Sequence, residues 1–170
     1  LTLCQQPLKD LRDSNPMCAQ ALMAQVGKSP LMAIATILNP IIPAGIYVYD
    51  GSDGLMILSR KPLENIEVID LSSISTLNRR RAIKATVGGV NVACTHLAAD
   101  LEKEAPYTGK FSSWKEEHKE QSLELIKQAE EKKVSLLMGD FNCSFSVPEL
   151  GILGEVEDNC ALFKQAGFAD

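Results

Sequence analysis

An aspartate and an asparagine, two residues apart, follow an apolar run in the last third of the chain. Leu136–Met138 runs into Gly-Asp-Phe-Asn, and the run predicts a buried strand that ends in a turn. Residues i and i+2 of an extended strand end point the same way, so Asp140 and Asn142 should share one face, with Phe141 anchored on the other. A carboxylate beside a neutral amide suits holding a water or a phosphoryl oxygen. Both residues are also ordinary turn residues, which is the alternative.

A histidine ends a second strand-like stretch upstream. Val90–Leu97 has alternating apolar residues and ends in Thr-His-Leu, and His96 is one of only two histidines. A histidine at one strand end near an aspartate at another forms a plausible acid/base or phosphate-binding pair. The alternative, if His96 is taken alone, is a histidine hydrogen-bonded at the edge of the core.

Three consecutive arginines, Arg79–Arg81, form the strongest basic run and precede a predicted strand. Charges of this kind can blunt an exposed sheet edge. Guanidinium groups can also clamp a phosphate at the rim of a cleft, because their donors match its oxygens. In the clamp interpretation Arg80 is the first candidate and Arg79 the second.

The remaining patterns predict strands that could position these residues. Ile66–Leu71 alternates and predicts a strand, and a turn cluster at 50–54 predicts a hairpin. That hairpin would join Gly45–Tyr49 to Leu55–Leu58. Gly88-Gly89 predicts a two-residue turn between Ala82–Val87 and the strand that carries His96.

Helical patterns frame the chain at both ends. Residues 1–25 predict helix broken at Asn15-Pro16, and 31–48 predict a proline-interrupted loop packed on the domain. Asp158–Ala166 predicts a short helix that Gly167 ends.

A long helix should run from a capping box at Ser113–Glu116 to about Lys132. We expect His118, which lies among Glu116, Glu117 and Glu120, at the surface or half-buried. The spacing of Glu116 and Glu120 could hold a metal, but it favours a solvated acidic face. The side of the helix expected to face the domain comprises Trp114, His118, Gln121 or Ser122, Leu125 and Ala129, widened by Leu123 and Ile126.

Taken in order, these stretches resemble the endonuclease/exonuclease/phosphatase superfamily, with its deoxyribonuclease I-like fold. The resemblance covers roughly Gly54 to Asp170, and the first fifty residues match only loosely. Three features of the family have no match in this sequence. The family opens with a strand ending in Asn and a strand ending in Gln-Glu, and it closes with Ser-Asp-His. The sequence thus looks truncated at both ends. The matching segments are Gly54–Pro62, Arg80–Ala85, Thr95–Leu97, Gly139–Asn142 and Phe163–Asp170.

The resemblance implies an α/β fold: a sandwich of mixed, mainly antiparallel sheets with outer helices, here incomplete. We expect one domain over 1–170, with a helical and irregular segment at 1–48 and the family core at 49–170. The resemblance also implies a role for each site residue. Asp140 would orient and deprotonate water and could contact a metal. Asn142 would hold the phosphoryl oxygen, and His96 would bind or protonate the phosphate. Arg80 and Arg79 would contact substrate. The expected ion is Mg²⁺, with Mn²⁺ or Ca²⁺ as alternatives, although the usual metal-binding Glu has no counterpart.

The function implied is metal-dependent phosphodiester hydrolysis by a secreted, nuclease-like protein acting on a nucleic acid. A sphingomyelinase-like or phosphoinositide phosphatase-like enzyme is a further alternative. An alternative of another class is a catalytically inactive structural or interaction protein that retains the middle of the fold. Missing strands would leave an open sheet edge, which invites an oligomer or a partner chain.

Composition limits the class of protein. The 170 residues suit one domain, and 45% hydrophobic with 23% charged residues is ordinary for a soluble globular chain. A net charge of −5 argues against general nucleic-acid binding by the whole surface, and no apolar run reaches membrane-spanning length.

The five cysteines leave two interpretations of the compartment. Cys4 could pair with Cys18, and Cys143 with Cys160, which would leave Cys94 as a small buried residue in a strand. Such pairing indicates an oxidising, extracellular setting. Five free thiols in a cytoplasmic protein are the alternative.

Overall fold

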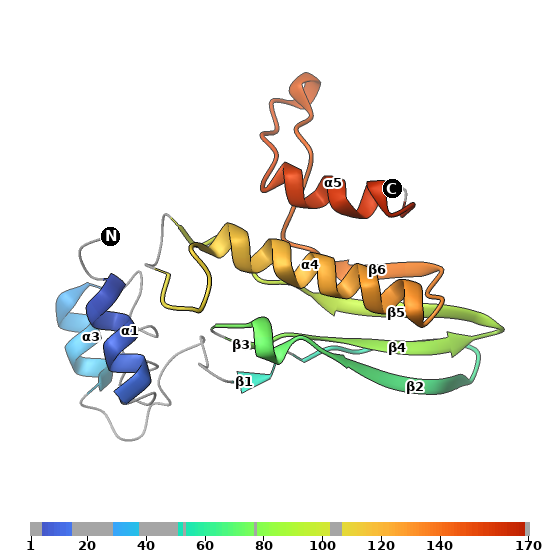
Figure 1. The fold of residues 1–170 in the computed structure, drawn as a ribbon, viewed down its shortest axis with the longest axis horizontal. Coiled ribbons are helices and arrows are strands. Elements are labelled where there is room, and N and C mark those ends of the chain that lie inside the picture. Colours follow the sequence, from blue (N-terminus) through green and yellow to red (C-terminus); the bar gives the residue numbers. More distant parts are fainter. Residues whose placement is uncertain are drawn as a thin grey trace.

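The structure, a computed structural model, describes residues 5–14, 29–37, 51–52, 54–76, 78–102 and 107–168. Figure 1 shows its helices and strands. In chain order they are α1 (Gln5–Ser14), α3 (Pro30–Ile37), β1 (Gly51–Ser52), β2 (Leu63–Asp70), the 3-10 helix η2 (Ser72–Ile74), β3 (Asn78–Arg79), β4 (Arg81–Val87), β5 (Val90–His96), α4 (Trp114–Glu131), β6 (Leu136–Asp140), the 3-10 helix η3 (Pro148–Leu150) and α5 (Glu157–Gln165).

A four-stranded mixed sheet organises the described chain. Its order is β2-β4-β5-β6, with antiparallel pairing except between β5 and β6, which run parallel and are joined through α4. The predicted two-residue hairpin is confirmed, because Gly88 and Gly89 link β4 to β5 with φ of 57° and 85°. The expectation of an α/β fold is thereby confirmed. The second sheet of a sandwich stays a prediction, as do the domain limits.

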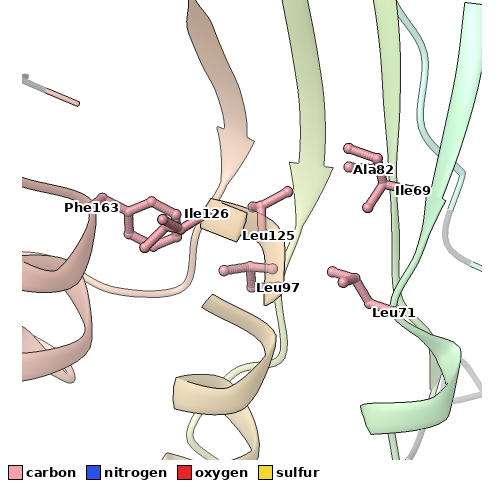
Figure 2. Packing of buried hydrophobic residues seen from close by; sticks show 7 residues of the cluster. All are labelled: Ile69, Leu71, Ala82, Leu97, Leu125, Ile126 and Phe163. Atoms are coloured by element: carbon pink, nitrogen blue, oxygen red, sulfur yellow. The ribbon is translucent and has the colours of Figure 1, made fainter. Parts of the chain in front are cut away.

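The two faces of this sheet differ. Cross-strand partners share a face. The partners Ile69 of β2 and Ala82 of β4 pack under α4 against Leu125. Figure 2 shows this core, which α5 completes through Phe163. The neighbouring row, Val68, Ile83, Cys94 and Met138, lies on the opposite face.

Helix α4 begins as predicted. The Ser113 hydroxyl accepts a hydrogen bond from the Glu116 backbone N–H at 3.1 Å, while the Glu116 carboxylate accepts one from the Ser112 N–H at 2.8 Å. The expected buried face is confirmed except at Leu123, which is 40% exposed.

Two neighbouring polar residues of α4 are fully buried, and His118 is thus more buried than the surface or half-buried position expected for it. Glu117 is 1% exposed and His118 is 0% exposed. The start of α4 packs on loops, not on strands, and loop backbone needs polar partners when it is buried. Hydrogen-bonding side chains therefore occupy a face that periodicity alone assigns to solvent or to apolar residues.

The strand before Asp140 is less buried than predicted. Leu136 is 48% exposed, because β6 is an edge of the sheet in the described part of the chain and α4 covers only one of its faces. Cys94 is likewise half-buried, not buried. The strand itself and the short helix at 157–165 are confirmed, and Gly167 ends that helix with φ of 90°.

The amino-terminal predictions fare worst. Residues 30–37 form a helix where a loop was expected, since Pro30 suits a first turn and the Ser29 backbone oxygen accepts from the Ala33 N–H at 2.9 Å. Residues 55–58 form no strand, and β1 instead pairs with β3 in parallel. Residues 45–49, the second half of the expected 1–25 helix, Cys4 and Cys18 lie outside the described residues.

Candidate active site at the ends of β5 and β6

The ends of two parallel strands bring a histidine and an aspartate together. His96 and Asp140 are the last residues of β5 and β6 and are register partners. The His96 Nε2 lies 3.7 Å from the Asp140 Oδ2, and the two side chains are 39% and 65% exposed. Alternation along the strands places both on the face opposite α4. An imidazole and a carboxylate therefore meet where a ligand can reach both.

A glycine lets these strand ends approach. Gly139 has φ of 127°, a conformation that side chains rarely adopt, and an added methyl group would overlap the Thr95 carbonyl oxygen. The Leu97 N–H then donates to the Asp140 backbone oxygen at 3.0 Å, which extends the pairing one step beyond β5.

Asn142 does not share a strand face with Asp140, contrary to the expectation, and instead links two parts of the site by hydrogen bonds. Its φ of 48° is left-handed, so the extended geometry ends at Asp140. The Asn142 N–H donates to the Asp140 Oδ1 at 2.9 Å, and the side-chain Nδ2 donates to the Leu97 carbonyl at 2.7 Å. Asn142 thus ties the carboxylate of Asp140 to the loop after His96.

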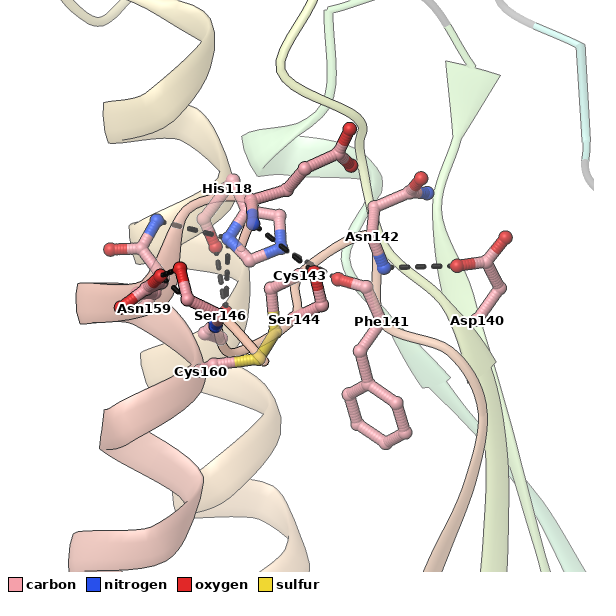
Figure 3. Close-up of a disulfide and its surroundings, with 12 residues drawn as sticks. His118, Asp140, Phe141, Asn142, Cys143, Ser144, Ser146, Asn159 and Cys160 are labelled. Atoms are coloured by element: carbon pink, nitrogen blue, oxygen red, sulfur yellow. Dashed lines mark hydrogen bonds between the residues drawn. A yellow bond between two sulfur atoms is a disulfide. The ribbon is translucent and has the colours of Figure 1, made fainter. Parts of the chain in front are cut away.

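The residues around this turn anchor it to the core. Phe141 packs edge-on against Phe163 of α5, with ring centroids 5.0 Å apart, which agrees with its expected anchoring role. The predicted Cys143–Cys160 disulfide is present and joins the turn to the same helix, as Figure 3 shows.

The two candidate arginines occupy different positions. Arg80 is half-buried, and its Nη1 donates to the His96 carbonyl at 3.3 Å, so the structure brings it to the strand ends. Arg79 is exposed in β3. The pKa of Asp70 is lowered by hydrogen bonds from Ser72 and, more weakly, by the charges of Arg81 and Arg79. The charge of Arg79 is the weakest of these effects.

A family comparison agrees with this geometry. The model of the endonuclease/exonuclease/phosphatase family matches residues 13–151. The chain belongs to this family. The match starts well before Gly54, where the motifs begin, and ends before the segment at 163–170. No curated protein and no solved structure matches the chain significantly.

Members of this family generally use divalent metal ions and hydrolyse phosphoesters. Among the described residues, no three His, Cys, Asp or Glu side chains gather as a metal site would require. The Asp140 carboxylate is a suitable hard oxygen donor, but one carboxylate beside an imidazole does not make a magnesium site. The described residues therefore supply one carboxylate donor for such an ion and not a complete ligand set.

Sequence analysis placed Gln121 and His118 on one face of α4 but did not reveal the hydrogen bonds by which they support the site. The Gln121 Oε1 accepts from the Ala98 N–H at 2.9 Å, and its Nε2 donates to the Ile74 carbonyl at 3.1 Å. The His118 Nε2 lies 2.7 Å from the Phe141 carbonyl oxygen. The available signal was spacing, because both residues fall on the helical stripe that contains Trp114 and Leu125.

Glu117 of α4 is also buried and fixes the segment that leads to Arg80. Its carboxylate accepts hydrogen bonds from the Thr76 N–H at 3.0 Å, from the Thr76 hydroxyl and from the Tyr107 hydroxyl at 3.0 Å. Burial raises the pKa of Glu117, although these donors and the nearby Arg80 charge oppose the rise. Burial also raises the pKa of Tyr107 to about 12, which keeps its hydroxyl a donor.

Proposed function

We propose that this protein hydrolyses phosphodiester bonds at the His96–Asp140 pair. The observation that carries the proposal is the 3.7 Å approach of an exposed imidazole to an exposed carboxylate at adjacent strand ends, in a chain of this family. A substrate oxygen atom that contacts this pair lies within reach of both a base and a hydrogen-bond donor.

Each described residue has a role in this proposal. Asp140 orients a water molecule and takes its proton as the water oxygen bonds to phosphorus and the ester P–O bond breaks. His96 binds the phosphate or gives a proton to the departing oxygen. Asn142 holds Asp140 through its N–H, and we assign its side chain a contact with the phosphoryl oxygen. Arg80, with Arg79 further out, adds positive charge for the substrate.

We infer that the reaction depends on a divalent ion, Mg²⁺ first and Mn²⁺ or Ca²⁺ as alternatives. The general use of such ions in the family supports this inference, and Asp140 is the described carboxylate that would contact the ion. When bound, such an ion stabilises negative charge that develops on phosphoryl oxygens.

The substrate class we favour is a nucleic acid, cleaved by a secreted protein. The Cys143–Cys160 disulfide supports the extracellular setting, because disulfides persist in oxidising compartments. A sphingomyelin-like lipid, which is a phosphodiester, and a phosphoinositide, whose ring phosphates are monoesters, are the alternative substrates, since each presents a phosphoryl group to the site.

The test measures cleavage of plasmid DNA, sphingomyelin, a phosphoinositide and a chromogenic phosphodiester, with Mg²⁺ or with EDTA. His96→Ala should lose about 10²- to 10⁴-fold in kcat, as removal of an acid/base group does. Glu130→Ala, on the exposed side of α4, is the matched control and should keep wild-type rates. Equal rates for wild type and His96→Ala would refute the assignment.

A second candidate, a binding protein without turnover, is favoured by exposed apolar residues on the two edge strands of the described four-stranded sheet. Ile66 and Val68 of the edge strand β2 are 60% and 59% exposed, and Leu136 of β6 is 48% exposed. Exposed apolar residues on sheet edges favour association with another chain. Sedimentation of the wild-type chain tests this candidate: a concentration-dependent dimer or larger species supports it, and a clean monomer counts against it.

A further inference from the structure

One peptide group beside Asp140 is held from both ends. The carbonyl of Phe141 and the N–H of Asn142 belong to the same peptide unit. The carbonyl oxygen lies 2.7 Å from the His118 Nε2, and the N–H donates to the Asp140 Oδ1 at 2.9 Å. Figure 3 shows the two contacts on opposite sides of the turn. Fixing this peptide plane fixes one carboxylate oxygen of Asp140.

The partners of His118 determine which ring nitrogen carries its proton. The Asn159 Nδ2 donates to the Lys115 carbonyl at 3.0 Å and lies 3.0 Å from the His118 Nδ1. An amide nitrogen has only protons to offer, so the Nδ1 accepts. The proton of a neutral ring is then on the Nε2, where it donates to the Phe141 carbonyl. Burial lowers the pKa of His118, in keeping with a neutral ring.

We propose that His118 is a positioning residue for Asp140, acting through the Phe141–Asn142 peptide. The order of donation is Asn159 to His118, His118 to the Phe141 carbonyl, and the Asn142 N–H to Asp140. A hydrogen bond at a carbonyl polarises its peptide and strengthens the N–H of the same unit as a donor. The remaining oxygen of Asp140 is left facing His96. This inference rests on the proposed function, because it assigns Asp140 the reacting carboxylate.

Two isosteric amides separate positioning from simple core packing. In His118→Gln the side-chain nitrogen can reach the place of the Nε2 and donate to the Phe141 carbonyl. In His118→Asn the amide ends near the place of the Nδ1 and cannot reach that carbonyl. Ser122→Ala is the packing control. The buried Ser122 hydroxyl donates its one proton to the His118 carbonyl at 2.9 Å, so it has none to donate to the Nδ1, which lies 3.5 Å away, and it does not contact the turn.

The readouts are kcat and KM for the chromogenic phosphodiester and the amide ¹H shift of Asn142 in an NMR spectrum. We expect His118→Asn to lower kcat about 10- to 100-fold with little change in KM, because the misplaced carboxylate acts in the transition state. Its Asn142 amide should move upfield. His118→Gln should recover most of both values, and Ser122→Ala should change neither.

A folded His118→Asn variant with wild-type kcat, or with an unmoved Asn142 amide, would overturn the inference. A ¹H–¹⁵N spectrum of the wild-type imidazoles tests it without any variant, and a proton on the Nδ1 of His118 would also overturn it. Absence of hydrolysis by the wild type would reject the proposed function alone, because the amide shift and the ring tautomer still decide the role of His118.

Discussion

Glu117 and His118 are neighbours on α4, yet they support different parts of the candidate site. Glu117 binds Thr76 and Tyr107, and so fixes the segment that leads to Arg80. His118 contacts the Phe141 carbonyl, and so fixes the turn that carries Asp140. One buried face of a single helix therefore sets the spacing between Arg80 and Asp140, which we propose bind the substrate and activate water.

The two residues respond to pH in opposite directions. Burial favours the uncharged form of each, so the pKa of Glu117 is raised and the pKa of His118 is lowered. Glu117 accepts hydrogen bonds, which a carboxylate does well in spite of burial, whereas His118 must both donate and accept, which only a neutral ring can do. The side chains are thus not interchangeable, and the following predictions separate their contributions.

The largest expected effect concerns the Cys143–Cys160 disulfide. Among the described residues, this covalent bond is found only in the turn that His118 contacts. Replacing Cys143 and Cys160 by serine opens a bridge between positions 17 residues apart. Unfolding in urea should show a loss of about 3 kcal/mol, because the unfolded chain regains its loop entropy. An unchanged free energy of unfolding would mean that hydrogen bonds alone hold this turn.

Glu117→Ala tests the other support. It leaves the Thr76 N–H and the Tyr107 hydroxyl buried without their acceptor, which should cost about 2 kcal/mol of unfolding free energy. Glu130→Ala, an exposed position on the same helix, should change stability by less than about 0.5 kcal/mol. Equal losses of unfolding free energy in the two variants would mean that Glu117 does not support this segment.

His118→Gln should reveal the pH dependence of the turn. The ordinary pKa of histidine is 6.5, and burial lowers the folded pKa of His118 below it, although the hydrogen bond to the Phe141 carbonyl and the nearby Asp100 charge oppose the shift. The stability that neutral His118 contributes is therefore complete above 6.5 and is lost as pH falls toward the folded pKa, by at most about 1.4 kcal/mol per pH unit. The advantage of wild type over His118→Gln in urea unfolding should shrink between about pH 7.5 and 5.5. A constant difference would contradict it.

Glu117→Gln should show the reverse slope. The folded pKa lies above the ordinary 4.5, so the native protein retains a proton that the unfolded chain has already released. The associated stability is present below 4.5 and is lost as pH rises through the folded pKa. The unfolding free energy of wild type should fall relative to that of Glu117→Gln as pH rises from about 4.5. A difference that changes with pH in the opposite direction would refute the burial effect.

The sequence anticipated the parts of this molecule that local patterns encode. The Gly88-Gly89 turn, the capped start of α4 and the Cys143–Cys160 pair each depend on a few neighbouring residues or on a simple cysteine choice. The family and the strand-end positions of His96 and Asp140 followed from ordered motifs.

Long-range packing hid the rest. Periodicity does not show that α4 packs on loops, so it did not reveal the full burial of Glu117 and His118. The left-handed Asn142 broke the strand geometry that would have paired its side chain with Asp140. The edge position of β6, which exposes Leu136, depends on which strands assemble, and no local pattern specifies that.

The most direct test of the account compares Asp140→Asn with wild type in Mg²⁺-dependent hydrolysis of a chromogenic phosphodiester. The substitution keeps the side-chain oxygen that accepts from the Asn142 N–H at 2.9 Å but removes the base. We predict that kcat falls about 10²- to 10⁴-fold, while the circular dichroism spectrum and the free energy of unfolding stay unchanged. An active wild type matched by an equally active Asp140→Asn would contradict it.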